Sequence, residues 1–154
     1  MTTPTIQWQY IPASRPNNLT HTQILESIKR AMNEWNNALK GIVNFNQGDK
    51  NCRLALIFDH IDTVTHPDRI GECRETPKGW EIAFNIKEKW NVGGWRKLLG
   101  VGYTLGSTVL HEIGHVLDLP HSDDPSFIMF PEYNEQLKLN KKEIADYRKF
   151  LIDN

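Results

Sequence analysis

The sequence predicts an α+β domain of about five strands and three helices. Two kinds of periodicity support this prediction. In the first half of the chain, apolar residues alternate along short segments, as they do in half-buried strands. In longer segments they recur every three or four residues, as in amphipathic helices. Because the strands come first, with helices between and after them, we expect a sheet flanked by helices.

Four short segments are expected to form strands. The alternation over residues 6–10 and again over 80–84 predicts strands with one buried face. Val43 and Phe45 suggest a shorter strand of the same kind. The continuous apolar run Leu54–Phe58 is short enough for a central strand that is buried within the sheet.

The first and last helices have recognisable ends. Thr20 can cap a helix whose apolar residues repeat at helical spacing, and Gly41 stands where that helix would stop. Asn140 and Glu143 have the spacing of a capping box, in which each residue satisfies a backbone N–H of the other. The last helix should therefore begin at this pair and end near Leu151.

The strongest chemical signal lies in a third helical segment. His111 and His115 are four residues apart, so a helix places both imidazoles on one face, where they can bind a single metal ion. Ser107 and Thr108 precede them and can cap or open this helix. The segment therefore predicts a helix that presents two metal ligands.

The residues that follow complete the pattern of a catalytic zinc site. Glu112 lies beside His111, close enough to hold a metal-bound water but poorly placed to be a ligand. Pro120 ends the helix, so the chain must turn before His121 returns as a third ligand. Asp118 stands in this turn, where we expect a left-handed backbone that aspartate tolerates better than most residues. Three protein nitrogens and one water make the open tetrahedral site of a catalytic zinc.

These residues resemble the extended H-E-x-x-H-x-x-G-x-x-H motif of the metzincin zinc peptidases, with Asp118 in place of the glycine. Met129, eight residues after His121, resembles the family's methionine turn, and residues 131–133 match its Pro-x-Tyr pocket wall. The chain is thus similar to a matrixin (matrix metalloproteinase-like) catalytic domain over residues 6–151. The resemblance implies a metzincin-like fold with a twisted mixed sheet and an active-site helix followed by a Met-turn.

The resemblance also implies a function, that of a zinc-dependent endopeptidase acting on extended polypeptides. In such an enzyme Glu112 is the general base for a zinc-activated water, and the zinc ligands are His111, His115 and His121. An apolar residue is expected after the scissile bond. The segment 70–74 resembles the edge strand to which a substrate adds, although its composition fits an exposed loop equally well. The residues expected to contact substrate are Leu110, Pro131, Tyr133, Gly71 and Glu72.

One catalytic zinc is expected, whereas a second structural zinc or a structural calcium is not. His60 and Asp62 resemble the first pair of the second zinc site of many matrixins, but Cys73 and Ala83 stand where its other two histidines belong. His60, Asp62 and His66 are therefore expected to be solvated loop residues. The family's calcium-binding loops are also not recognisable.

Composition limits the other possibilities. With 18 Lys and Arg against 19 Asp and Glu, the net charge of −1 gives no indication of a nucleic-acid or membrane partner, and a monomer is expected. Residues 1–154 should form one domain, without a secretory signal or a membrane span. Such a protein is secreted if its chain has been trimmed, and cytoplasmic or exported by a non-classical route otherwise. Cys52 and Cys73 either pair or remain reduced.

Two other functions are compatible with the zinc motif. A zinc-binding module could hold a peptide in the same groove without turnover, and it would be marked by loss of Glu112 or of a ligand, neither of which has occurred. A metal-dependent amidase acting on cell-wall peptides is the other alternative, because the motif alone does not distinguish it from an endopeptidase.

Overall fold

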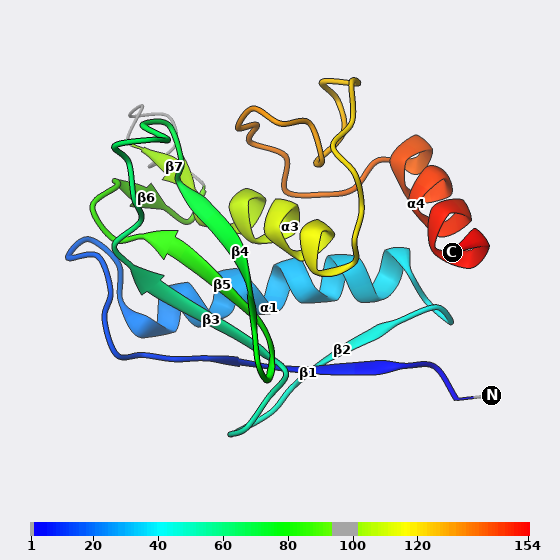
Figure 1. Ribbon diagram of the computed structural model, residues 1–154, viewed down its shortest axis with the longest axis horizontal. Helices are drawn as coiled ribbons and strands as arrows, with labels where there is room; N and C mark the ends of the chain where they lie inside the picture. The colour runs from blue at the N-terminus through cyan, green and yellow to red at the C-terminus, as the bar shows by residue number, and fades with distance from the viewer. Residues whose placement is uncertain (1, 94–101) are drawn as a thin grey trace.

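The computed structural model describes residues 2–93 and 102–154 (Figure 1). Within these residues the chain forms a five-stranded sheet, three helices and a separate pair of two-residue strands. The predicted α+β class is thereby confirmed. In chain order the elements are β1 (Thr5–Tyr10), α1 (His21–Ala38), β2 (Asn44–Gln47), β3 (Leu54–Asp59), β4 (Gly71–Thr76), β5 (Gly79–Asn85), β6 (Trp90–Asn91), β7 (Tyr103–Thr104), α3 (Leu105–Val116) and α4 (Lys141–Asp153).

The large sheet is mixed, with the strand order β2-β1-β3-β5-β4. All neighbouring strands are parallel except β4, which is antiparallel to β5. The predicted central strand is β3, where Leu54, Leu56 and Phe58 are buried and the residues between them are half-buried. An apolar run therefore stands in the middle of the sheet, where water is excluded from it.

The segment 70–74 is a strand, not an exposed loop. Its residues 71–74 lie within β4, which forms a hairpin with β5 and occupies the edge of the sheet. Thr76 pairs with Gly79, so only two residues make the turn. Gly79 has a φ of 146°, and a side chain there would overlap the carbonyl of Arg53. The hairpin therefore depends on a glycine at this corner.

The predicted caps of the first and last helices are present. The Thr20 side chain accepts a hydrogen bond from the Gln23 N–H at 3.1 Å, and the Gln23 side chain accepts one from Thr20 at 2.9 Å. The chain leaves α1 through Gly41, which has a φ of 85°. The capping box of Asn140 and Glu143 begins α4, as the sequence predicts.

The helix that carries the histidines begins earlier than expected. Its N-cap is Thr104, and Ser107 and Thr108 lie inside the first turns of α3 instead of capping it. Both are buried, so their hydroxyls need acceptors, and both donate to the Thr104 carbonyl, at 2.9 and 3.3 Å. The two hydroxyls are therefore satisfied by the helix itself.

The helices α1 and α3 lie side by side along one face of the sheet (Figure 1). The Trp35 indole on α1 donates a hydrogen bond to the Leu110 carbonyl on α3 at 3.1 Å. Phe58, Phe84 and Trp90 form an aromatic cluster elsewhere in the core, with ring centroids 5.4 to 5.9 Å apart. The contacts of α3 with α1 and β4 hold it beside the edge of the sheet. Both cysteines are free thiols.

Candidate metal centre and cleft

Two histidines project from one face of α3. His111 and His115 are four residues apart, one turn of the helix, and their Nε2 atoms lie 3.2 Å from each other. The opposite face of the helix is packed into the core through Val109, Leu110 and Ile113, which are fully buried. This burial prevents the helix from rotating, so the two imidazoles keep their direction.

A tight turn brings the third histidine back to the first two. The helix ends at Val116, and the Leu119 N–H bonds to the Gly114 carbonyl at 3.0 Å. Asp118 has a φ of 57°, which confirms the left-handed backbone expected at this position. His121 then places its Nε2 atom 3.3 Å from that of His115.

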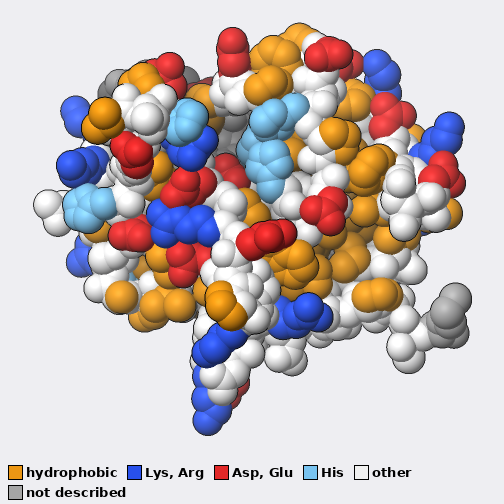
Figure 2. Space-filling model, in the orientation of Figure 1, with side chains coloured by type: hydrophobic (Ala, Val, Ile, Leu, Met, Phe, Trp, Pro, Cys, Tyr) orange, Lys and Arg blue, Asp and Glu red, His pale blue; other side chains and the backbone are white. Residues whose placement is uncertain are grey.

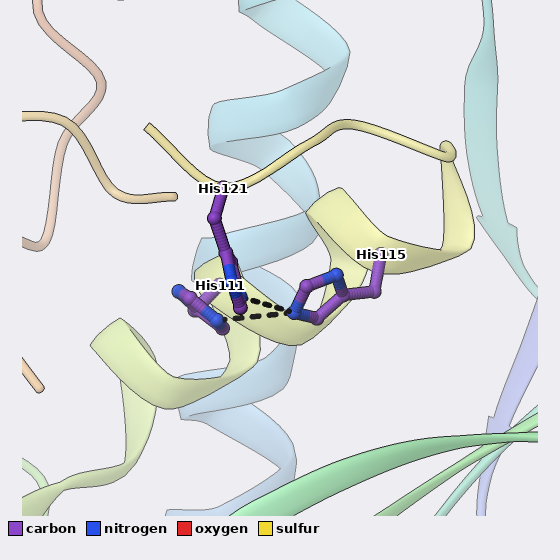
Figure 3. Close-up of side chains that lie close together, drawn as sticks. All are labelled: His111, His115 and His121. Carbon is purple, nitrogen blue, oxygen red and sulfur yellow. Dashed lines mark hydrogen bonds between the residues drawn. The ribbon is translucent and has the colours of Figure 1, made fainter. Parts of the chain in front are cut away.

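The arrangement of the three imidazoles fits a tetrahedral zinc ion (Figure 3). The ligand nitrogens of His111, His115 and His121 all lie within 4.8 Å of one another. Zinc–nitrogen bonds of about 2.0–2.1 Å in a tetrahedron place the nitrogens about 3.3–3.4 Å apart. The observed separations of 3.2 and 3.3 Å match this edge length. The triad therefore has the size of a zinc site as well as its residue types.

The protonation of the histidines also suits metal binding. Burial lowers the pKa of His111, and burial together with the two neighbouring imidazoles lowers the pKa of His115 to about 4. The Nδ1 atom of His111 lies 2.6 Å from the Ile128 carbonyl, which can only accept, so Nδ1 carries the proton. The lone pair of Nε2 therefore points toward the other two histidines.

Glu112 lies one residue from the first ligand and is buried, with 6% of its surface exposed. Burial raises the pKa of this carboxyl group to about 7; the charge of Glu72 raises it further and that of Arg69 opposes the shift. Gly71 on β4 leaves room for it, because a side chain there would come within 3.3 Å of Glu112 Oε1.

Met129 lies directly against α3, the helix that carries His111 and His115. It is fully buried, and a side chain at Gly114, between the two helical histidines, would overlap its sulfur atom. The Met129 carbonyl accepts a hydrogen bond from the Ser122 N–H at 2.9 Å, which ties it to the segment just after His121. The methionine therefore supports both the helix and the returning loop.

A cavity of about 770 Å³ runs along the histidines, between the edge strand β4 and the segment 131–134. Figure 2 shows histidine side chains in the middle of this face, with acidic and basic side chains beside them. Four of the residues expected to contact substrate line the cavity, namely Gly71, Glu72, Pro131 and Tyr133.

Leu110, the fifth, faces elsewhere. It is fully buried, points into the core, and lines a separate cavity between α1 and α3. The helix instead presents Thr108 to the main cavity. Helical spacing explains the difference, because Thr108 is four residues before Glu112 and shares its face, whereas Leu110 is half a turn away. The spacing of these residues in the sequence is therefore sufficient to distinguish Thr108 from Leu110.

Tyr133 connects the wall of the cavity to the start of the metal-binding helix. Its hydroxyl accepts a hydrogen bond from the Thr104 N–H at 2.7 Å, and its ring meets that of Tyr103 edge-on, with centroids 4.9 Å apart. The wall and the helix are therefore held together as one unit.

A second group of residues that could bind a metal ion lies on the loop before β4, and its side chains do not come together. His60, Asp62 and His66 are exposed, as expected. Both carboxylate oxygens of Asp62 accept hydrogen bonds at 2.9 Å from residues just after it in the chain, Val64 and Thr65. In the described ranges, one group of three or more His, Cys, Asp or Glu side chains is near enough to share an ion. It consists of His111, His115 and His121.

A mixed five-stranded sheet, a helix that carries two histidines, a third histidine after a turn and a methionine beneath them define the metzincin class. Within this class the chain belongs to the matrixin family, because the Matrixin family model matches residues 2–150. No helix among the described residues has both the length and the apolar character that a membrane span requires.

Several curated relatives are similar to the chain. Matrix metalloproteinase-20 of Homo sapiens is 28% identical over 127 residues, which cover 75% of this chain and 24% of that protein. Matrilysin of Homo sapiens is 32% identical over 78 residues, covering 48% of this chain and 27% of that protein. Neutrophil collagenase of Homo sapiens is 29% identical over 122 residues, or 75% of this chain and 25% of that protein. The chain thus spans about a quarter of the length of these relatives.

Proposed function

We propose that this protein is a zinc-dependent endopeptidase whose residues 1–154 act as one catalytic domain. Its zinc ligands are His111, His115 and His121, and its general base is Glu112. The observation that carries the proposal is the match between the nitrogen separations of the triad and a tetrahedral zinc, beside a buried carboxyl group in an open cavity. Membership of the matrixin family supports the same conclusion.

The chemistry is divided between the metal and the chain. Zinc, when bound, supplies a Lewis acid that polarises the scissile carbonyl and lowers the pKa of water. Glu112 takes the proton as water attacks and then gives it to the leaving nitrogen. A pKa raised to about 7 by burial suits both steps, since the group can accept a proton and release it near neutral pH.

The proposed substrate is an extended polypeptide that adds to the outer edge of β4. Among the described residues no strand pairs with this edge, β4 lines the cavity, and Gly71 has no side chain to obstruct a close approach. The residue after the scissile bond is proposed to be apolar and to lie against Pro131 and Tyr133. The methyl group of Thr108 lies beside Gly71 of β4, because its hydroxyl is bonded to the helix backbone.

The proposal includes one zinc ion per chain, a monomeric protein, and a protein or peptide as the partner, with no role in binding nucleic acid or membranes. Met129 is proposed to act as the Met-turn residue that supports the ligands. A metal count by mass spectrometry under native conditions tests the number of ions and of chains together.

The function is tested by incubating the protein with casein, with and without a chelator, beside the variant Glu112→Ala. We expect cleavage by the unmodified protein, loss of cleavage with the chelator, and a fall of about 10²–10⁴-fold in the variant while zinc stays bound. Binding of peptides without any cleavage would favour the non-catalytic module. Cleavage of cell-wall peptides but not of casein would favour the amidase.

A further inference from the structure

Glu143 is a fully buried carboxylate that lies outside the histidine cluster. One of its oxygens, Oε1, accepts hydrogen bonds from the Ile128 N–H at 2.8 Å and from the Tyr147 hydroxyl at 3.3 Å. The other, Oε2, accepts from the Asn140 N–H at 2.8 Å and from the Gln136 side-chain amide. A buried charge is costly unless it is hydrogen-bonded, and here four neutral donors satisfy it.

The capping box accounts for only half of these bonds. A capping residue needs one oxygen for the N–H of the N-cap, and Oε2 of Glu143 serves that purpose at Asn140. The bond from Oε1 to Ile128 instead reaches a residue 15 positions earlier in the chain. Glu143 therefore connects the start of α4 to the segment that carries Met129.

Ile128 is in turn the partner of a metal-binding residue. Its carbonyl accepts the proton of His111 Nδ1 at 2.6 Å, while its N–H donates to Glu143. The backbone of this one residue is thus held from both sides. The direction of the carbonyl determines the direction of the imidazole, and with it the position of Nε2 relative to His115.

We propose that Glu143 is a positioning residue of the metal centre, which acts by fixing the Ile128 backbone so that its carbonyl orients His111. This inference rests on the proposed function, since it assumes that His111 binds zinc. Loss of a direct hydrogen-bond partner of a ligand costs about 10–100-fold in metal affinity. Glu143 stands one bond further away, so we expect an effect of about tenfold.

The variant Glu143→Gln, compared with a control, separates the role of Glu143 in capping α4 from its role in fixing the Ile128 backbone. The N–H groups of Ile128 and Asn140 each need an acceptor, whereas an amide has a single oxygen, so one of them loses its bond. The matched control is Asn140→Ala, which removes the other half of the capping box and the 3.0 Å bond from the Asn140 side-chain amide to the Ser126 carbonyl, and leaves both carboxylate bonds in place. Circular dichroism of both metal-free variants establishes that they fold.

Zinc affinity, measured by competition with a chromophoric chelator, is the first readout. We expect Glu143→Gln to bind zinc about tenfold more weakly than the unmodified protein, and Asn140→Ala to stay within about twofold. The second readout is the NMR signal of the His111 Nδ1 proton in the zinc-loaded proteins. It should move and exchange faster with water in Glu143→Gln only. Equal affinities in the two variants, or an unchanged proton signal, would overturn the proposal.

A measurement on the unmodified protein covers the case in which Glu143→Gln does not fold. If the carboxylate tightens zinc binding, zinc must stabilise the contacts of the carboxylate to the same degree. Hydrogen exchange at the Ile128 N–H, which donates to Glu143, should therefore slow when zinc is added, and an unchanged rate would refute the coupling. Failure of the unmodified protein to bind zinc would instead contradict the proposed function itself.

Discussion

Two regions of this molecule carry histidines together with a carboxylate, and they differ in how the chain holds them. In the first, His111 is fixed by the Ile128 carbonyl, and the turn at Asp118 brings His121 back toward the helix. In the second, His60 and His66 are exposed to water along a loop. The carboxylate differs as well, being buried at Glu112 and fully exposed to solvent in the loop.

The difference shows that residues able to bind a metal ion form a metal site only where the backbone brings their side chains together. The helix and its turn bring the three histidines together within residues 111–121, and the more distant Ile128 then fixes the orientation of His111. The second group would need side chains from two further strands, β4 and β5. Cys73 lines the main cavity instead, and Ala83 has no ligand atom.

The largest effect is expected from removing one ligand of the convergent group. Structural zinc sites bind with about 10–16 kcal/mol over four ligands, so His115→Ala should weaken zinc binding by on the order of a hundredfold or more. Turnover should disappear with the metal. The matched variant His60→Ala, in the loop and outside the cavity, should leave zinc affinity and activity unchanged. Isothermal titration with zinc measures the affinity of both variants, and a comparable loss in His60→Ala would abolish the distinction between the regions.

A smaller effect is expected from disturbing the support beneath the ligands. Gly114→Ala places a methyl group on the Met129 sulfur, so we expect a loss of about 1–3 kcal/mol in the free energy of unfolding and weaker zinc binding. Gly106→Ala is the control in the same helix, because its methyl group would meet only the flexible end of Leu137. Urea denaturation of the metal-free proteins compares them. Equal free energies of unfolding in the two variants would mean that the Met129 side chain moves away from the added methyl group without loss of stability.

In the turn between His115 and His121, a substitution is expected to stabilise the protein instead of destabilising it. Asp118 holds a left-handed backbone that glycine adopts freely, so Asp118→Gly should stabilise the protein by about 0.5–1 kcal/mol. Its exposed neighbour Asp123 does not have a positive φ, and Asp123→Gly should not stabilise. Thermal unfolding measures the two changes. A destabilised Asp118→Gly variant would show that the carboxylate, not the backbone, is what this turn requires.

The smallest expected effect is a change in how the stability of the protein depends on pH. The pKa of Asp124 is lowered to about 2, first by the Ser126 side chain and backbone and then by Lys142. Because its pKa in the folded state lies below that in the unfolded state, its contribution to stability is present above about pH 4 and is lost as the pH falls toward 2. Asp124→Asn should therefore flatten this part of the stability profile of the metal-free protein. The exposed Asp123→Asn is the control, and identical profiles would contradict the expectation.

Local patterns in the sequence were sufficient for most of the fold and for the candidate ligands. The caps at Thr20 and Asn140, the central strand Leu54–Phe58 and the left-handed turn at Asp118 each depend on neighbours within a few positions, and all are confirmed. The edge position of β4 is different, because pairing with a neighbouring strand decides it. Composition alone therefore left strand and loop equally possible.

Two kinds of feature escaped prediction for different reasons. The true start of α3 at Leu105 depends on buried hydroxyls that bond within the helix, and the same hydroxyls are typical of caps when exposed. The second role of Glu143 depends on a bond to Ile128, and no pattern in the sequence connects these two residues. Its capping role was visible because that partner is only three positions away.

The two-residue turn of the β4–β5 hairpin has a consequence for the cavity at the other end of the strand. Side chains alternate between the faces of a strand, so the length of this turn decides whether Gly71 or Glu72 stands beside Glu112. One extra residue in the turn would shift the strand by one position and turn a second carboxylate toward the first. The spacing of charge in the cleft is thus set at a corner of the fold outside the cavity, where Gly79 passes the Arg53 carbonyl.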